Sequence, residues 1–272
     1  MSGFSAEDWL VPQWPAPPRV RACVTTRNGG MSTGPYASLN LGGHVGDDPA
    51  AVRSNRVFLA QTLGVQVRWL DQVHGTEVVE QTPAWPDGGA EGMPLRADAV
   101  FSCQPGVVCA VLTADCLPVL LCNRSGSWVA AVHAGWRGLA AGVIEATLAR
   151  HPGPASELLA WLGPAIGPQA FEVGGEVRQA FMDEQAVLDN RFRAEVADCF
   201  RPGGAGKWFC NLFALARWRL LRAGLRDGAI AGGEVCTWHD EAHFFSYRRD
   251  GVTGRFASLI WLADDDDGVG PY

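Results

Sequence analysis

Residues 113–138, TADCLPVLLCNRSGSWVAAVHAGWRG, are the stretch around which this sequence is organised. The stretch contains two short apolar runs, 117–122 and 127–133, on either side of a polar turn that includes a glycine. Apolar runs of this length, bounded by turn residues, are typical of buried strands, and the short connection predicts a β-hairpin. The hairpin brings Cys116, at the start of the first strand, close to His133, at the end of the second.

A thiolate and an imidazole side by side are either two ligands of a transition metal or a nucleophile with its general base. A cysteine in an apolar stretch is more often a small core residue, and a histidine beside a strand is more often a hydrogen-bonded one. Here, however, Asp115 precedes Cys116, and a glycine-rich turn at 134–138 follows His133. Short loops at strand ends are where rigid sheets carry reactive side chains, so we interpret this stretch as a functional site.

The composition is that of a globular protein, and its charge balance does not predict a basic surface that binds polyanions. The 272 residues carry a formal net charge of −7 and are 47% hydrophobic and 19% charged. A chain with this acidic balance is not expected to bind nucleic acid or anionic membranes. The longest apolar region, 107–122, contains Asp115 and Pro118 and is too short and too polar to span a bilayer.

The cysteines predict a reducing compartment. The chain has eight of them, with no CxxC pair, and several stand inside apolar runs. The first residues lack the basic and apolar regions of a signal peptide. We therefore predict free thiols and a cytoplasmic location.

The hydrophobic pattern predicts a single α+β domain over residues 1–272, with sheet layers covered by helices. An irregular arm at 1–18 and an acidic tail at 264–272 are expected at its ends. Helices are predicted where apolar positions recur at helical spacing, and strands where short apolar runs occur. The predicted helices are 47–63, 139–150, 176–183 and 211–222, and further strands are predicted at 20–26, 65–73, 97–102, 107–112, 158–162, 229–236, 243–247 and 255–263.

Two other regions offer candidate binding residues. His74 stands at a kink that Gly75 permits, directly after the segment 65–73. Arg27 follows the first predicted strand, and the loop from there to residue 46 is rich in glycine and contains Asn40. The backbone N–H groups of such a loop, together with an arginine, are suited to binding an anion.

Five motifs, taken together, resemble those of one protein family. This is the laccase-domain family, whose members are also described as multicopper polyphenol oxidases, YfiH-like proteins, purine nucleoside phosphorylases and peptidoglycan editing factors. The resemblance spans nearly the whole chain, and the CLPVLL and HAGWRG segments are its most specific parts. The motifs are LDQVHGT at 70–76, TADCLPVLL at 113–121, AAVHAGWRGLAAGV at 130–143, GPAIGP-x-x-FEVG at 163–174 and FFSYRRDGVTGR at 244–255.

The resemblance implies that His74, Cys116 and His133 are the ligands of a zinc or copper ion. It also implies a four-layer α-β-β-α sandwich with mixed sheets. The implied activity is phosphorolysis of adenosine, inosine and methylthioadenosine, with an added adenosine deaminase activity. Ala165 and Gln169 stand where family members often have cysteine, and this departure leaves the preferred nucleoside open.

Two histidines and one cysteine are three ligands, and three protein ligands leave a metal ion open to water or substrate. A zinc ion in such a site activates water, which suits deamination at a purine C6. Asp115 is a candidate acid/base group, or a partner that orients a ligand. Four other polar side chains are predicted to hold the nucleoside or the phosphate: Arg27, Asn40, Arg56 and Gln72.

Three other functions are compatible with parts of the sequence. A cysteine-type hydrolase or amidase that edits peptidoglycan precursors would use Cys116 as nucleophile and His133 as base, with His74 assisting. A copper-dependent polyphenol oxidase needs many histidine ligands, usually with HxH pairs, whereas this chain has six histidines and no such pair. A metal-binding scaffold without catalysis is the third alternative. Two assays separate these functions. A hydrolase should stay active after chelation, a phosphorylase should need phosphate, and a scaffold should catalyse neither reaction.

Overall fold

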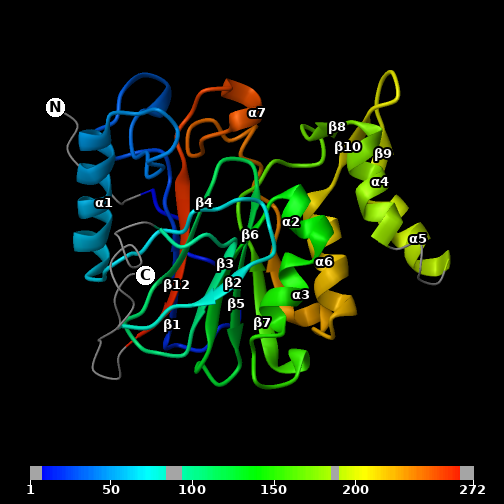
Figure 1. Ribbon diagram of the computed structural model, residues 1–272, viewed down its shortest axis with the longest axis horizontal. Helices are drawn as coiled ribbons and strands as arrows, with labels where there is room; N and C mark the ends of the chain where they lie inside the picture. Colours follow the sequence, from blue (N-terminus) through cyan, green and yellow to red (C-terminus); the bar gives the residue numbers. More distant parts are fainter. Residues whose placement is uncertain (1–7, 84–93, 185–189, 264–272) are drawn as a thin grey trace.

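The computed structural model describes residues 8–83, 94–184 and 190–263. These residues form four layers, which Figure 1 shows from left to right as an outer helix, a three-stranded sheet, a six-stranded sheet and a second layer of helices. The arrangement is an α-β-β-α sandwich of an α+β protein, so the predicted fold class is confirmed.

Two sheets lie face to face in the middle of the molecule. The three-stranded sheet has the order β1 (Val20–Val24), β12 (Phe256–Leu262) and β4 (Cys109–Thr113), and the six-stranded sheet has the order β11 (Ile230–Gly232), β7 (Leu158–Leu162), β5 (Leu117–Asn123), β6 (Val129–Ala134), β3 (Ala99–Ser102) and β2 (Val78–Glu80). The smaller sheet is antiparallel throughout. In the larger sheet β11 and β2 run parallel to their neighbours and the other pairs are antiparallel, so this sheet is mixed.

Strand β5 is buried on both faces because it serves two cores. Leu117, Val119 and Leu121 face the helices, whereas Leu120 and Cys122 face the other sheet. Successive side chains of a strand point to opposite faces, so a continuous apolar run is what a central strand of a sandwich requires. Burying each leucine side chain stabilises the fold by roughly 1.5–3 kcal/mol.

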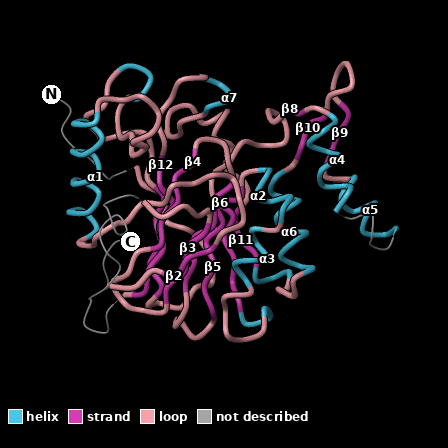
Figure 2. Tube along the Cα trace, viewed as in Figure 1, coloured by secondary structure: helices cyan, strands magenta, loops and turns pink. Residues whose placement is uncertain are grey.

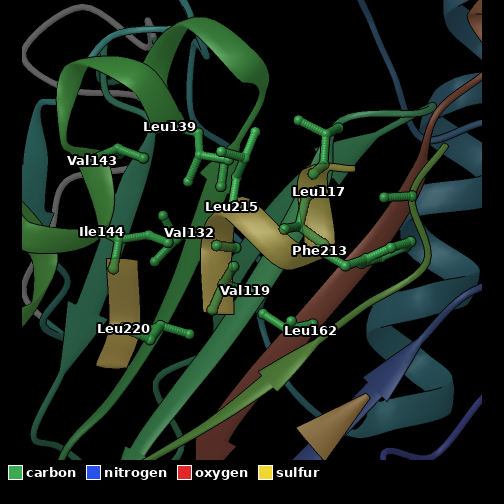
Figure 3. Packing of buried hydrophobic residues seen from close by; sticks show 14 of the residues in the cluster. Leu117, Val119, Val132, Leu139, Val143, Ile144, Leu162, Phe213, Leu215 and Leu220 are labelled. Carbon is green, nitrogen blue, oxygen red and sulfur yellow. The ribbon is translucent and has the colours of Figure 1, made fainter. Parts of the chain in front are cut away.

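Helices cover the outer face of each sheet. On one side α1 (Pro49–Leu63) packs Leu59 against the three-stranded sheet. It begins at Asp48, whose side chain caps the N–H of Ala50, and it ends at Gly64 in the left-handed conformation. On the other side Figure 3 shows the core between the six-stranded sheet and three helices, which are α2 (Trp136–Ala141), α3 (Val143–Leu148) and α6 (Leu212–Arg222).

A small third sheet lies beside the second layer of helices, at the upper right of Figure 2. Its strand order is β8 (Glu172–Val173), β10 (Trp208–Cys210) and β9 (Phe200–Pro202). Helices α4 (Gly175–Glu184) and α5 (Asn190–Ala197) accompany it, and the short helix α7 (Tyr247–Asp250) lies at the upper edge of the sandwich. Among the described residues, no helix is both long enough and apolar enough to cross a bilayer.

Four predicted elements differ from the structure. The predicted helix 139–150 is two helices, because Gly142 adopts a left-handed conformation with φ 96° between them. The segment 65–73 makes only isolated bridges from Val67 and Asp71, so its apolar residues pack without forming a strand. In the predicted strand 243–247, Phe244 and Phe245 are likewise buried in the core without forming a strand, and α7 begins at Tyr247. The predicted strand 229–236 is shortened to β11, where Gly232 and Gly233 turn the chain away.

The predicted arm and tail at the two chain ends are described only from residue 8 and up to residue 263. Within the arm at 1–18, Leu10 forms a bridge with Val24, and Trp9 is buried. The acidic tail 264–272 lies outside the described residues. All eight cysteines are free thiols, as their spacing predicts.

Candidate metal centre

The hairpin of β5 and β6 brings Cys116 and His133 together. The two strands pair in antiparallel register, with Leu117 opposite Ala134 and Pro118 opposite His133. Cys116 directly precedes β5, so it lies across from the last residues of β6. The hairpin and this juxtaposition are therefore set by local strand pairing, as predicted.

His74 reaches the same place from the loop before β2. Its Nε2 atom lies 3.7 Å from the Cys116 Sγ, and its ring lies 4.8 Å from the His133 ring between centroids. The ligand atoms of His74, Cys116 and His133 all lie within 4.8 Å of one another, and they are the one group of this kind in the described part of the chain. We call these three residues the His-Cys-His cluster. His74 is exposed, Cys116 is half-buried and His133 is buried.

Asp98 holds both histidines of the cluster in place. Its carboxylate is 2.8 Å from His133 Nδ1, and it accepts hydrogen bonds from the backbone N–H groups of His74 at 2.8 Å and Gly75 at 2.7 Å. Its backbone carbonyl accepts from the N–H of His133 at 2.7 Å. With Nδ1 bonded to Asp98, the Nε2 atom of His133 is left for a metal.

Gly135 leaves room for the cluster. A Cβ atom at this position would lie 3.0 Å from both the Cys116 Sγ and the His74 Cδ2, and 3.5 Å from the His133 Nε2. The chain therefore passes close to all three ligands without filling the space between them. Two imidazoles and a thiolate with this spacing fit a borderline-soft ion such as zinc or copper, so the cluster suggests a metal site without fixing the metal.

The electrostatics favour the ligand form of the cysteine. Burial raises the pKa of the Cys116 thiol, but His133 and His74 outweigh burial, and the pKa falls to about 6. Burial lowers the pKa of His133, but Cys116 and Asp98 outweigh it and raise that pKa. Burial also opposes ionisation of Asp98, but the hydrogen bonds from His133 and Gly75 lower its pKa. A thiolate is both a metal ligand and a nucleophile.

Two cavities meet at the cluster. The larger has a volume of about 340 Å³ and the smaller about 210 Å³. His74, Ala114, Cys116 and Tyr247 line both of them. A bound molecule can therefore extend to either side of the cluster.

Basic groups surround the larger cavity. His44 and Arg255 line it, and Arg56 lies close enough to them that its charge, after burial and the charge of Arg255, lowers the pKa of His44. The Arg255 Nη1 atom donates to the carbonyls of Thr253 and Gly254. No carboxylate of the described chain lies within ion-pair distance of Arg255 or Arg56.

Comparison with known proteins identifies the family of this chain. A family sequence model described as multi-copper polyphenol oxidoreductase laccase matches residues 21–263. The chain belongs to this family. A purine nucleoside phosphorylase of Pseudomonas aeruginosa is 55% identical over 257 residues, covering 94% of this chain and 99% of that protein. The purine nucleoside phosphorylase YfiH of Escherichia coli is 51% identical over 255 residues, covering 93% of this chain and 98% of that protein.

Solved structures of the family have the same fold. A Neisseria meningitidis protein superimposes with a TM-score of 0.85 at 48% identity, covering 95% of this chain and 100% of its own. YlmD of Geobacillus stearothermophilus superimposes with a TM-score of 0.83 at 32% identity, covering 97% of this chain and 100% of its own. The four-layer sandwich is thus the fold of the family.

The predicted substrate residues occupy different places around the site. Gln72 lines the larger cavity, and its side-chain amide bonds the N–H and carbonyl of Leu112, each at 2.8 Å. Asn40 is buried and lines neither cavity, but its Oδ1 accepts from the N–H of Arg255 at 2.8 Å. Arg56 also lines neither, and its Nε and Nη2 donate to the carbonyl of Leu41.

Arg27 is engaged elsewhere. Its Nε donates to the carbonyl of Ala37 at 3.1 Å, its Nη1 donates to the carbonyl of Glu241 at 3.3 Å, and its guanidinium lies over the Phe245 ring. It lines neither of the two cavities. These contacts join the loop after β1 to the segment before α7.

Asp115 faces the smaller cavity and does not bond the histidines of the cluster. Its carboxylate accepts from Thr237 Oγ1 at 2.7 Å and from the N–H of Arg248 at 2.6 Å. The expectation that Asp115 is a partner that orients a ligand is therefore corrected, because Asp98 makes the hydrogen bonds to His133 and His74.

Sequence reasoning missed four residues of the site: His44, Asp98, Tyr247 and Arg255. Asp98 had one usable signal, since it is an acidic residue directly before the buried strand β3. Arg255 and Tyr247 belong to a recognised motif but gave no sign of the cavity that they line.

The histidines do not form a multicopper centre. Four histidines lie outside the cluster: His44 lies in the cavity wall, His151 contacts Trp128, His239 contacts Cys236 and His243 pairs with Asp240. Blue-copper and trinuclear sites need many more histidines in mutual contact than the described residues bring together.

Proposed function

We propose that this protein is a metal-dependent purine nucleoside phosphorylase of the cytoplasm. Its substrates are adenosine, inosine and methylthioadenosine, which it cleaves with inorganic phosphate to the free base and a ribose 1-phosphate. The observation that carries the proposal is Arg255, which lines the same cavity as the His-Cys-His cluster and has no carboxylate partner among the described residues. The names of the relatives support the same reaction class.

An arginine that lines a cavity and has no carboxylate partner among the described residues indicates an anionic ligand. Removing a guanidinium from water costs free energy unless an opposite charge compensates it. The chain carries a net charge of −7, so its average field repels anions, and a phosphate needs a local positive site. Arg255, with His44 beside it and Arg56 behind, supplies that site. We therefore place the phosphate near Arg255 and not near Arg27.

The roles of the residues follow from their positions. A phosphate oxygen attacks C1′ of the ribose, the C1′–N9 bond breaks, and its electron pair passes to the purine, which takes up a proton. Arg255 and His44 hold the phosphate for this attack. Asp98 fixes His133 and the backbone of His74, and Asp115, in the wall of the smaller cavity, is the candidate acid/base group.

A zinc-type ion held by His74, Cys116 and His133 would supply positive charge at the reacting centre and a water of lowered pKa. The same site therefore supports deamination of adenosine at C6 as a second activity. The same three side chains hold the ion in both reactions. The reactions differ in the second substrate, which is phosphate for phosphorolysis and water for deamination.

A second candidate function rests on a specific observation. Cys116, His133 and Asp98 form a thiol–imidazole–carboxylate series, and the pKa of the thiol is lowered to about 6. This series also suits a cysteine-type hydrolase or amidase acting on peptidoglycan precursors. Such an enzyme needs neither a metal nor phosphate.

The test is a chromatographic assay of the purified protein with inosine, with and without phosphate and with and without a chelator. We expect hypoxanthine and ribose 1-phosphate only when phosphate is present, and loss of both on chelation. Arg255→Gln should raise the KM for phosphate roughly ten- to a hundredfold, because a charge-assisted hydrogen bond contributes about 1.5–3 kcal/mol. Arg53→Gln, on the exposed face of α1, is the matched control. Base release at the full rate without phosphate would show a hydrolase.

A further inference from the structure

Asn55 is a fully buried polar residue on the inner face of α1, the outer helix of Figure 1. The other buried side chains of this helix belong to Val52 and Leu59, and both are apolar. Burying an amide on such a face costs free energy unless its donor and acceptor groups find partners. An asparagine at this position therefore indicates that α1 holds a neighbouring segment by hydrogen bonds.

The segment that Asn55 holds is the loop between β1 and α1. The Oδ1 atom of Asn55 accepts from the N–H of Met31 at 2.8 Å, and its Nδ2 atom donates to Ser32 Oγ at 3.0 Å. The same Nδ2 atom donates to the carbonyls of Ser38 at 3.2 Å and Asn40 at 2.9 Å. One side chain of α1 therefore fixes this loop at both of its ends.

Asn40 joins the loop to Arg255, which directly precedes β12. Asn40 is fully buried, and its Oδ1 atom accepts from the backbone N–H groups of Arg255 at 2.8 Å and of Gly42 at 2.9 Å. The N–H of Leu41 donates to the carbonyl of Arg255 at 3.0 Å. Residues 40 and 41 therefore hold both backbone groups of Arg255.

The loop also fixes the aliphatic part of the Arg255 side chain. A Cβ atom at Gly42 would lie 2.8 Å from the Arg255 Cγ, so a glycine is needed for this close approach. Behind the loop, Arg56 of α1 donates from Nε and Nη2 to the carbonyl of Leu41 at 2.9 and 2.7 Å. The segment 40–42 is thus held from one side by α1 and holds Arg255 on the other.

We propose that Asn55 and Asn40 are positioning residues that set the direction in which the Arg255 guanidinium faces the larger cavity. This inference rests on the proposed function, in which Arg255 holds the phosphate. Neither asparagine lines either of the two cavities. An arginine loses rotamer freedom when it binds an anion, and fixing its backbone and Cγ beforehand reduces that cost. Asn40 therefore acts through Arg255, in place of the predicted contact with substrate.

The test compares Asn55→Ala and Asn40→Ala with Arg255→Gln, by steady-state kinetics with inosine and phosphate and by calorimetry of phosphate binding. Both asparagine variants should raise the KM for phosphate by roughly three- to tenfold, less than Arg255→Gln, because they keep the charge but lose the hydrogen bonds that orient it. The KM for inosine and the metal content should stay unchanged. A purely structural role would lower the amount of active enzyme without a selective rise in one KM.

Two further variants control for stability. Val52→Ala truncates an apolar side chain on the same face of α1, so it should lower the melting temperature and leave the KM for phosphate unchanged. Gly42→Ala displaces the Arg255 side chain without removing a polar group from the core, and it should raise the KM for phosphate selectively. It gives a second reading if an asparagine variant does not fold, and an unchanged KM in Gly42→Ala would contradict the proposal.

The outcomes separate this inference from the proposed function. Phosphorolysis that depends on Arg255, with an unchanged KM for phosphate in the folded asparagine variants, would overturn the positioning role and leave the phosphorylase standing. Phosphate binding that depends on Arg255, Asn40 and Asn55, in a protein that cleaves no nucleoside, would support the positioning role and overturn the phosphorylase. An equal rise in the KM for inosine in Asn40→Ala would place Asn40 against the nucleoside and refute its indirect role.

Discussion

Two regions of this molecule contain the same types of reactive side chain, but only one gathers them into a site. The His-Cys-His cluster and Asp98 come from four separate segments, whereas the segment 236–243 carries Cys236, His239, Asp240 and His243 in one turn. In the turn, His239 Nδ1 lies 3.1 Å from the Cys236 Sγ, which is closer than the 3.7 Å between Cys116 and His74.

The difference lies in what surrounds each pair. In the turn, His243 bonds Asp240 at 2.7 Å, but both are partly exposed, and the described residues bring no third ligand to Cys236 and His239. In the cluster, Asp98 is buried and holds two histidines at once. A close cysteine–histidine contact is therefore not sufficient for a metal site, because the ligands also need convergence and fixed orientation.

The largest expected effect comes from removing the thiol. Cys116→Ala should abolish metal binding and lower turnover by more than roughly 100-fold. Loss of a residue that only supports a ligand already lowers metal affinity or activity by roughly 10- to 100-fold, and this variant removes the ligand itself. Cys236→Ala should leave metal content and turnover unchanged. Metal analysis and the inosine assay measure both variants. Full metal content in Cys116→Ala would refute the ligand assignment, and unfolding of that variant would indicate a structural ion.

A smaller effect is expected from the carboxylates that orient the histidines. Asp98→Asn should weaken metal affinity by roughly 10- to 100-fold, because the amide no longer stabilises the His133 tautomer that leaves Nε2 for the metal. Asp240→Asn, which changes the equivalent partner of His243, should have no effect on metal affinity. Competition with a chromogenic chelator gives both values. Equal loss in the two variants would mean that the cluster and the turn do not differ as described.

The smallest effect concerns the glycines that pack against each sulfur. A Cβ at Gly135 would lie 3.0 Å from the Cys116 Sγ, and a Cβ at Gly167 would lie 3.0 Å from the Cys236 Sγ. Both alanine variants should lose about 1–3 kcal/mol of stability through overpacking. Only Gly135→Ala should also weaken metal binding, by a few-fold. Thermal unfolding and chelator competition separate the effects, and unaltered metal affinity in Gly135→Ala would show that the cluster tolerates displacement.

The sequence by itself determined the parts of this protein that depend on local order. The apolar runs around Gly126 predict the hairpin of β5 and β6, and strand pairing then brings Cys116 and His133 together. The Asp48 cap and Gly64 likewise predict both ends of α1. These features need only neighbouring residues, because strand alternation, turns and caps depend on a few consecutive backbone conformations. His74 entered through the resemblance to the family, since its distance in sequence from Cys116 gives no local signal.

Tertiary structure alone decided which polar residues surround the cluster. Asp98, His44 and Arg255 come from distant segments, and no periodicity relates them to Cys116. Arg27 looked as suitable for an anion as Arg255 does, but packing turned it toward the carbonyls of Ala37 and Glu241. The physical reason is that an arginine's role depends on whether a carbonyl, a carboxylate or a cavity lies within reach. Contacts between distant segments form only when the two sheets and their connecting loops have packed.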